Sequence, residues 1–147
     1  MKGLLIIIKQ EHKHIIDPNI IAENKTIARA AYERGDYVLC FLLIHSLIEV
    51  LSRAFLSQTG KESFNELIDL YKQYIKEQGQ VRLTFVDELT QFNRRRNRVV
   101  HNLWKHGYRV TNEKLKPACR AAFIMFGLFI EWLETFDPAI IDLGFHK

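Results

Sequence analysis

Apolar side chains recur at every third or fourth position through most of the chain, a spacing that predicts helices. The second such segment is apolar on nearly every face, which is typical of the central helix of a bundle. Glycines and prolines interrupt the pattern and separate the segments. We expect an all-α fold, a bundle of four or five up-and-down helices joined by short loops. The expected helices cover residues 17–34, 36–59, 63–78, 81–104 and 111–136.

Capping residues support these boundaries. Pro18 suits the first turn of the first helix, and Asp36 is placed to cap the second. Ser63 and Glu66 form a capping box at the start of the third. Pro117 should kink or delay the start of the last helix, because proline has no backbone N–H. Residues 1–16 form an N-terminal arm, in which residues 4–8 fit either a short strand or a turn of helix.

The composition narrows the class of protein. The chain has 147 residues, 48% of them hydrophobic, with seven glycines and three prolines. These values predict one globular domain over residues 1–147 and exclude disordered and collagen-like chains. Uninterrupted apolar runs fall short of the ~18–20 residues that span a bilayer, and the N-terminal apolar stretch lacks a cleavage pattern. We therefore expect a cytoplasmic protein with no membrane partner.

The two cysteines and the absence of several known motifs limit the cofactors and enzyme classes that the sequence is compatible with. Cys40 and Cys119 lie among apolar neighbours, which predicts small core residues in a reducing compartment, with a disulfide between them as the alternative. The sequence has no zinc-type Cys/His spacing, phosphate-binding glycine loop, nucleophile elbow or carboxylate cluster suited to Mg²⁺. We expect no metal and no cofactor, and kinase, polymerase and α/β-hydrolase functions are disfavoured.

Positive charge is concentrated in one segment. The net charge is +4, but residues 91–112 contain six cations and no acid, so the remainder of the chain is slightly acidic. Such a concentration attracts phosphates and speeds encounters with nucleic acid. The alternative is a solvated helix face. The six cations are Arg94, Arg95, Arg96, Arg98, Lys105 and Arg109.

The expected helix 81–104 carries two distinct faces. At 100° per residue, Arg96 falls in the middle of the apolar stripe, where a guanidinium is costly unless it is paired, reaches a polar cleft or extends its head past the stripe. Asn97 and His101 lie one turn apart on a neighbouring polar face with Arg94. An imidazole that can move a proton near neutral pH, beside guanidiniums that bind phosphate, suits phosphodiester chemistry.

Residues 96–101 have the order arginine, asparagine, three residues, histidine. Late in a helix of a small all-α chain, this order resembles the signature of the HEPN superfamily of helical domains. Arg94 and Arg95 also satisfy the family's looser spacing, in which four to six residues separate the arginine from the histidine. The Arg-Asn pair makes Arg96 the natural match. The resemblance implies a single HEPN-like domain.

Catalytic HEPN members are metal-independent endoribonucleases that act as dimers, with the two motifs forming one composite site. The resemblance therefore implies a homodimer that cleaves RNA and leaves 2′,3′-cyclic phosphate ends. His101 would act as acid and base at the ribose 2′-hydroxyl, Arg96 would hold the phosphate, and Asn97 would orient these groups. Such members are often toxins or phage-defence effectors, silenced by a partner such as a small nucleotidyltransferase antitoxin. Leu103 stands where some toxins have a modified tyrosine, so that regulation is not expected.

The geometry of an ideal helix sets a condition on this site. Arg96 and His101 point about 140° apart, so a shared site requires that the helix ends or bends near Val100, or that the two residues meet across a dimer axis. The alternative to a nuclease is a catalytically inactive HEPN-like scaffold or nucleic-acid-binding module that acts through a partner protein.

Two further residues have a functional and a structural interpretation each. Glu49 pairs with Arg96 and orients it, or forms an ordinary i,i+4 ion pair with Arg53. Trp104 belongs to a basic, aromatic loop that stacks on unpaired bases, or it anchors the packing between helices. The expected RNA-binding residues are Arg94, Arg95, Arg98, Trp104, Lys105 and Arg109.

Overall fold

The computed structural model describes residues 17–57, 59–77, 84–136, 141–142 and 144–145. The predicted N-terminal arm, residues 1–16, lies outside this range. The described residues confirm the all-α class: they form helices and contain no strand. The helices are α2 (Pro18–Glu33), α3 (Tyr37–Leu56), α4 (Phe64–Glu77), α5 (Thr84–His106), α6 (Tyr108–Glu113) and α7 (Lys116–Phe136).

The described helices number six rather than the four or five expected, because the predicted last helix is divided. Residues 108–113 form the separate short helix α6, and α7 begins only at Lys116, directly before Pro117. The predicted delay at Pro117 is therefore confirmed, whereas the predicted start at Thr111 is wrong. Gly107, with φ of 85°, makes the corner between α5 and α6 in a backbone conformation that favours glycine.

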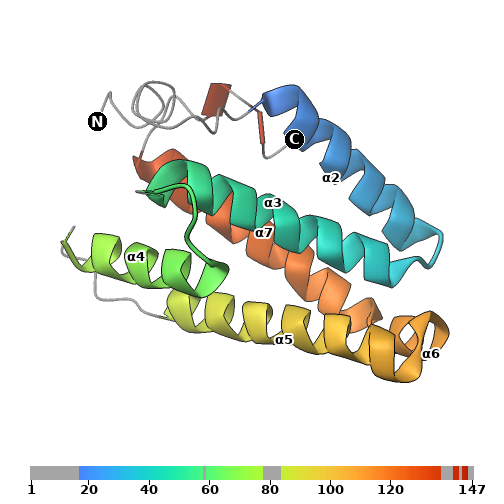
Figure 1. The fold of residues 1–147 in the computed structure, drawn as a ribbon. Coiled ribbons are helices and arrows are strands. Elements are labelled where there is room, and N and C mark those ends of the chain that lie inside the picture. The colour runs from blue at the N-terminus through green and yellow to red at the C-terminus, as the bar shows by residue number, and fades with distance from the viewer. Residues whose placement is uncertain (1–16, 58, 78–83, 137–140, 143, 146–147) are drawn as a thin grey trace.

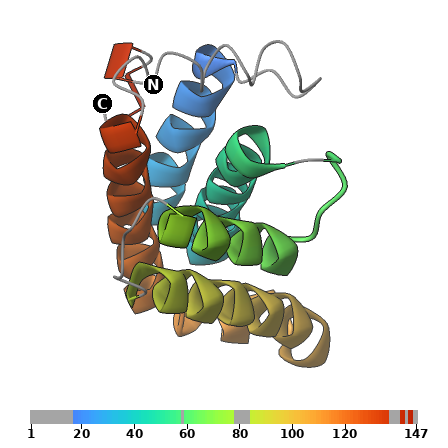
Figure 2. The same ribbon diagram turned by 90° about the vertical axis from the view of Figure 1, so that its left-hand side faces the viewer.

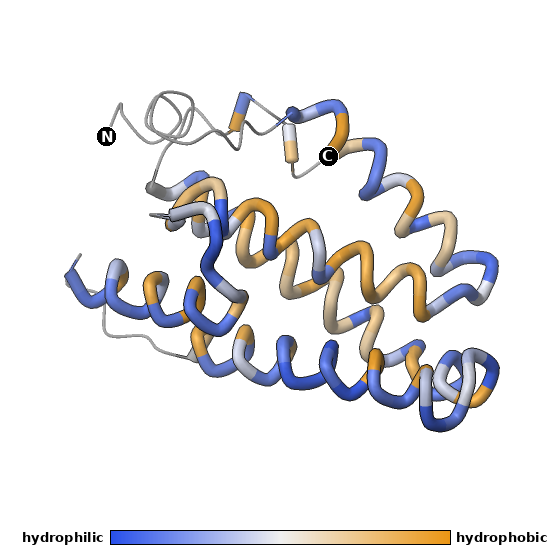
Figure 3. The backbone as a smooth tube through the Cα atoms, in the orientation of Figure 1, coloured by the Kyte–Doolittle hydropathy of each residue, from blue (hydrophilic) through white to orange (hydrophobic). Residues whose placement is uncertain are grey.

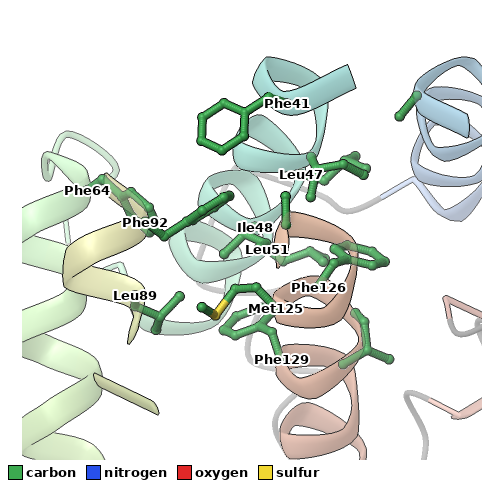
Figure 4. Packing of buried hydrophobic residues seen from close by; sticks show 14 of the residues in the cluster. Phe41, Leu47, Ile48, Leu51, Phe64, Leu89, Phe92, Met125, Phe126 and Phe129 are labelled. Carbon is green, nitrogen blue, oxygen red and sulfur yellow. The ribbon is translucent and has the colours of Figure 1, made fainter. Parts of the chain in front are cut away.

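Helix α3 is the centre of the bundle. It packs against α2, α4, α5, α6 and α7 (Figure 1). Its fully buried side chains include Phe41, Ile48 and Leu51, and Figure 4 shows Ile48 and Leu51 on the side of α3 that faces Phe126 of α7. Length and composition alone would let Tyr37–Leu56 cross a membrane, but 56% of its most apolar window is buried by the other helices, as in a core helix. Figure 3 shows the contrast between this apolar centre and the polar middle of α5.

The beginning of α3 is held by a residue that is distant in sequence. The side chain of Asp36 does not cap the helix, contrary to the sequence prediction. Instead, Asn112 of α6 accepts a hydrogen bond from the Val38 backbone at 2.9 Å and donates one to the Gly35 carbonyl at 2.8 Å. Asp36 binds the Tyr108 hydroxyl and Arg34. These contacts fix α6 against the α2–α3 turn.

Helix α4 covers only the first part of α5. The predicted capping box begins α4, with reciprocal Ser63–Glu66 hydrogen bonds of 3.0 and 3.2 Å. The two helices run antiparallel, with Asn65 of α4 bonded to Asn93 of α5 at 2.9 Å and the Tyr71 ring against Phe85. Figure 2 shows this pair stacked one above the other, with α2 and α7 extending away. The part of α5 that follows Asn93 is therefore not covered by α4 (Figure 1).

Cys40 and Cys119 are both buried and both free, as their apolar neighbours predict, and the alternative of a disulfide is wrong. The Cys119 thiol donates to the Tyr37 carbonyl at 3.1 Å. The two cysteines therefore serve as small packing residues between α3 and α7.

Candidate nucleic-acid interface

The motif Arg96–Asn97–His101 lies on the uncovered part of α5. Leu89, Phe92 and Val99 are buried against the core, as the helical wheel predicts. Arg96 is partly buried beside this stripe, and its Nη1 donates to Asn97 Oδ1 at 3.1 Å. The guanidinium thus extends its head to the surface rather than remaining in the core. Asn97 and His101 are exposed.

Helix α5 continues without interruption to His106. The helix therefore does not end near Val100, which was one of the two alternatives, and a regular helix places Arg96 and His101 about 140° apart. A regular helix thus directs the two side chains to different sides of α5 within one chain. The other geometry that the sequence leaves open, a meeting of the two residues across a dimer axis, stays a prediction.

A polar cluster, buried except for Asn65, supports α5 on the side that faces α3 and α4. His45 Nε2 lies 3.2 Å from Asn93 Oδ1, and Asn93 Nδ2 donates to Asn65 Oδ1 at 2.9 Å. Since the Asn93 amide uses its N–H₂ on Asn65, its oxygen accepts from His45, which assigns the imidazole proton to Nε2. The cluster links α3, α4 and α5 through hydrogen bonds. It therefore fixes which face of α5 is turned toward the core.

The same cluster keeps His45 neutral. Burial lowers the pKa of His45 from 6.5 to about 4, and the positive charge of Arg96 acts in the same direction. The hydrogen bond with Asn93 and the charge of Glu49 oppose this shift without reversing it. The imidazole packs edge-on against Phe64 and beside Phe92, with ring centroids at 4.8 and 5.0 Å. His45 is therefore a structural residue at neutral pH.

Glu49 pairs with Arg53 and not with Arg96. Arg53 Nη2 lies 2.9 Å from Glu49 Oε2 and also donates to the Glu62 carbonyl at 2.9 Å. The i,i+4 interpretation is thus the one that the structure shows, and the expected pairing of Glu49 with Arg96 is not formed. The pair ties α3 to the segment that leads into α4.

The basic residues of α5 and α6 other than Arg96 are exposed, but the expected basic loop is not a loop. Trp104 and Lys105 lie in the last turn of α5, and Arg109 lies in α6. Trp104 is 89% exposed, so it is not a packing anchor within one chain. The Tyr108 hydroxyl is engaged by Asp36, a bond that raises the pKa of Tyr108 to about 12. Arg94, Arg95 and Arg98 are exposed along α5.

Asn93 is the residue of this region that sequence reasoning missed. It lies at the edge of the apolar stripe of α5, and its partners His45 and Asn65 come from two other helices. The sequence did contain one signal for Asn93, namely a polar residue beside the apolar stripe of a helix. It does not identify the partner.

Nothing in the described part of the chain is suited to a metal: no group of three or more His, Cys, Asp or Glu side chains lies close enough there to hold an ion. The family models, the curated proteins and the solved structures contain no match to this chain. The site must therefore be interpreted from its own geometry. That geometry consists of an exposed imidazole and amide beside a surface guanidinium, in the basic part of α5 that α4 does not cover.

Proposed function

We propose that the protein is a metal-independent endoribonuclease of the HEPN type, with a composite active site at a homodimer interface. The observation that carries the proposal is the placement of Arg96, Asn97 and His101 on the half of α5 that α4 leaves uncovered. An uncovered helix face can meet its own copy across a two-fold axis, which brings the same residues of both chains together. The exposed Trp104 ring extends that face and supplies apolar area for such a contact.

The chemistry follows from the types of side chain. His101 of one chain removes the proton of a ribose 2′-hydroxyl, and the 2′-oxygen attacks the adjacent phosphorus. The bond from phosphorus to the 5′-oxygen of the next nucleotide breaks, and that oxygen takes up a proton. The products are a 2′,3′-cyclic phosphate and a free 5′-hydroxyl. Arg96 of the other chain binds the phosphate oxygens and the charge that builds on them. Asn97 holds the Arg96 guanidinium through the bond at 3.1 Å.

The biological setting that this activity fits is a toxin or a phage-defence effector in the cytoplasm. A partner that covers the uncovered face of α5 would silence the nuclease, and a small nucleotidyltransferase antitoxin is the kind of partner we propose. The basic segment contributes the attraction for RNA.

A second candidate is a catalytically inactive binding module. It is favoured by the unbroken course of α5, because a regular helix directs Arg96 and His101 to different sides, whereas the exposed cations need no shared site to bind a strand. Under this function the protein would bind RNA and leave it intact.

Incubation of purified protein with RNA in excess EDTA separates the two candidates. Under the proposed nuclease function, the wild-type protein cleaves RNA in the chelator and leaves 2′,3′-cyclic phosphate ends, and both His101→Ala and Arg96→Ala lose the activity. Lys76→Gln, an exposed cation on α4, is the matched control and should cleave like the wild type. Binding of RNA without cleavage by the wild-type protein would support the binding module and refute the nuclease.

A further inference from the structure

A cleft lies where α5, α6 and the start of α7 meet, and it does not contain Arg96, Asn97 or His101. Its volume is about 320 Å³. Arg95, Arg98 and His106 line it from α5, and Lys114 lines it from the end of α6. No acidic residue lines it, although Glu113 is the immediate neighbour of Lys114 in sequence. The cleft is therefore a basic site separate from the proposed catalytic residues.

The three cations of this cleft are not neutralised by the protein. Across the described residues, Arg95, Arg98 and Lys114 make neither an ion pair nor a side-chain hydrogen bond. All three are exposed, so their charges remain hydrated and available. Like charges around one cleft repel, and an anion that binds between them removes this repulsion as well as forming charge-assisted hydrogen bonds.

The walls of the cleft differ from its rim. Val99, Val110 and Leu115 provide apolar surface, and the Asn102 amide lies among the cations. A ligand that carries both anionic groups and flat apolar surface matches this combination better than a small inorganic ion does. A nucleotide unit, with a phosphate for the rim and a sugar and base for the walls, has this character.

The basic residues that line the cleft from α5, Arg95, Arg98 and His106, form a row along the helix. The length of this row indicates whether the cleft fits a strand or a single phosphate. Arg95 and His106 are 11 residues apart on one helix, which corresponds to about 16 Å along the axis. Successive nucleotides of a stacked strand rise about 3.4 Å each, so the row spans several phosphates. Arg98 also lies only about 60° from His101 around α5, and it connects the cleft with the face that carries the motif.

We propose that this cleft binds the phosphodiester backbone of single-stranded RNA, several nucleotides away from the cleaved bond. The inference deepens the proposed function, because it states where a strand that reaches His101 continues. The guanidiniums of Arg95 and Arg98 and the Lys114 ammonium contact successive phosphates, and sugars or bases lie on the apolar walls. Such binding is independent of sequence and sensitive to salt.

The test uses a short 2′-O-methyl RNA oligonucleotide, which cannot be cleaved through its 2′-oxygen. Fluorescence anisotropy gives its affinity for the wild-type protein and for Arg98→Gln, Lys114→Gln and the double variant. One lost phosphate contact lowers the affinity about 5-fold at 0.1 M salt, and two lower it about 25-fold. The slope of log affinity against log salt should become shallower by about 1.4 in the double variant. Lys76→Gln is the matched control and should bind like the wild type. A double variant that binds like this control would overturn the proposal.

Two further arms make the result specific. Inorganic pyrophosphate and a nucleoside monophosphate should compete only weakly with the oligonucleotide; if either competes as strongly as an unlabelled strand, the cleft is a site for a small anion and the strand proposal is wrong. His101→Ala should retain the affinity for the oligonucleotide. Loss of affinity in the cleft variants, together with intact RNA in the EDTA assay, would support the cleft and refute the nuclease. Normal cleavage by the wild-type protein, together with unchanged affinity in the cleft variants, would support the nuclease and refute the cleft.

Discussion

Two inactive variants of the protein should restore each other's activity when their chains are mixed. In one chain, Arg96 and His101 differ by five residues, so their positions on the helix surface are about 13 Å apart when the rotation of 140° and the axial rise are combined. A single phosphate needs both groups within hydrogen-bond reach, about 3 Å. On this geometry one chain does not supply both groups to the same phosphate, so the proposed nuclease would take Arg96 from one copy and His101 from the other.

The expected magnitude follows from the symmetry. The two-fold axis of the proposed dimer relates two pairings of Arg96 with His101 within the composite site. A dimer formed from one Arg96→Ala chain and one His101→Ala chain has one pairing with both native residues and one pairing with neither. Random exchange makes half of the dimers mixed, so about a quarter of the wild-type activity per chain should return. Each variant alone, which has one residue missing from both of its pairings, should remain inactive.

The assay mixes the purified variants, allows the subunits to exchange and measures RNA cleavage in EDTA against time. Exchange is followed independently with fluorescent labels on the two variants. A double variant that carries both substitutions, mixed with wild-type protein, provides the control, because its mixed dimers contain no complete pairing. If exchange is complete and the mixture of the single variants remains inactive, the composite-site reasoning is refuted.

Three predictions concern the bundle itself. Phe129→Ala should lower the free energy of unfolding by about 3–5 kcal/mol, because the ring is fully buried, and a loss below 1 kcal/mol in urea denaturation would contradict this packing. Burial lowers the pKa of His45 to about 4, so the unfolded chain binds a proton between pH 6.5 and 4 that the folded chain does not. Stability should therefore fall by up to about 3 kcal/mol as the pH drops through this interval, and His45→Gln should flatten the dependence. Asn112→Ala removes the bonds to Val38 and Gly35 and should cost about 2 kcal/mol in thermal unfolding, whereas Lys76→Gln should cost almost nothing.

Local signals predicted the helices well, because burial against one core imposes the helical period on the sequence. The stripe of Leu89, Phe92 and Val99 in α5 was predicted from spacing alone and is buried. The exposure of Asn97 and His101 follows from the same period.

Contacts between segments that are distant in the sequence could not be predicted from these local patterns. Asn112 caps α3 from a position 74 residues away, and no local pattern indicates it. The exposure of Trp104 depends on how far α4 extends along α5, which the spacing of neither helix reveals. The pairing of Glu49 was open because Arg53 lies on the same helix and Arg96 on another, and only the packed structure distinguishes them.

The corner at Gly107 determines more than the end of a helix. Its φ of 85° turns the chain back so that α6 and the first turn of α7 form the second wall of the basic cleft. A Cβ at this position would meet no atom within 4 Å, so a side chain there would strain the backbone without a steric clash. A substitution at Gly107 that shifts this dihedral angle would move α6 relative to α5 and change the width of the cleft, while every charge that lines it is conserved. A variant at this corner would therefore separate the shape of the cleft from its charge as the cause of the binding that we propose.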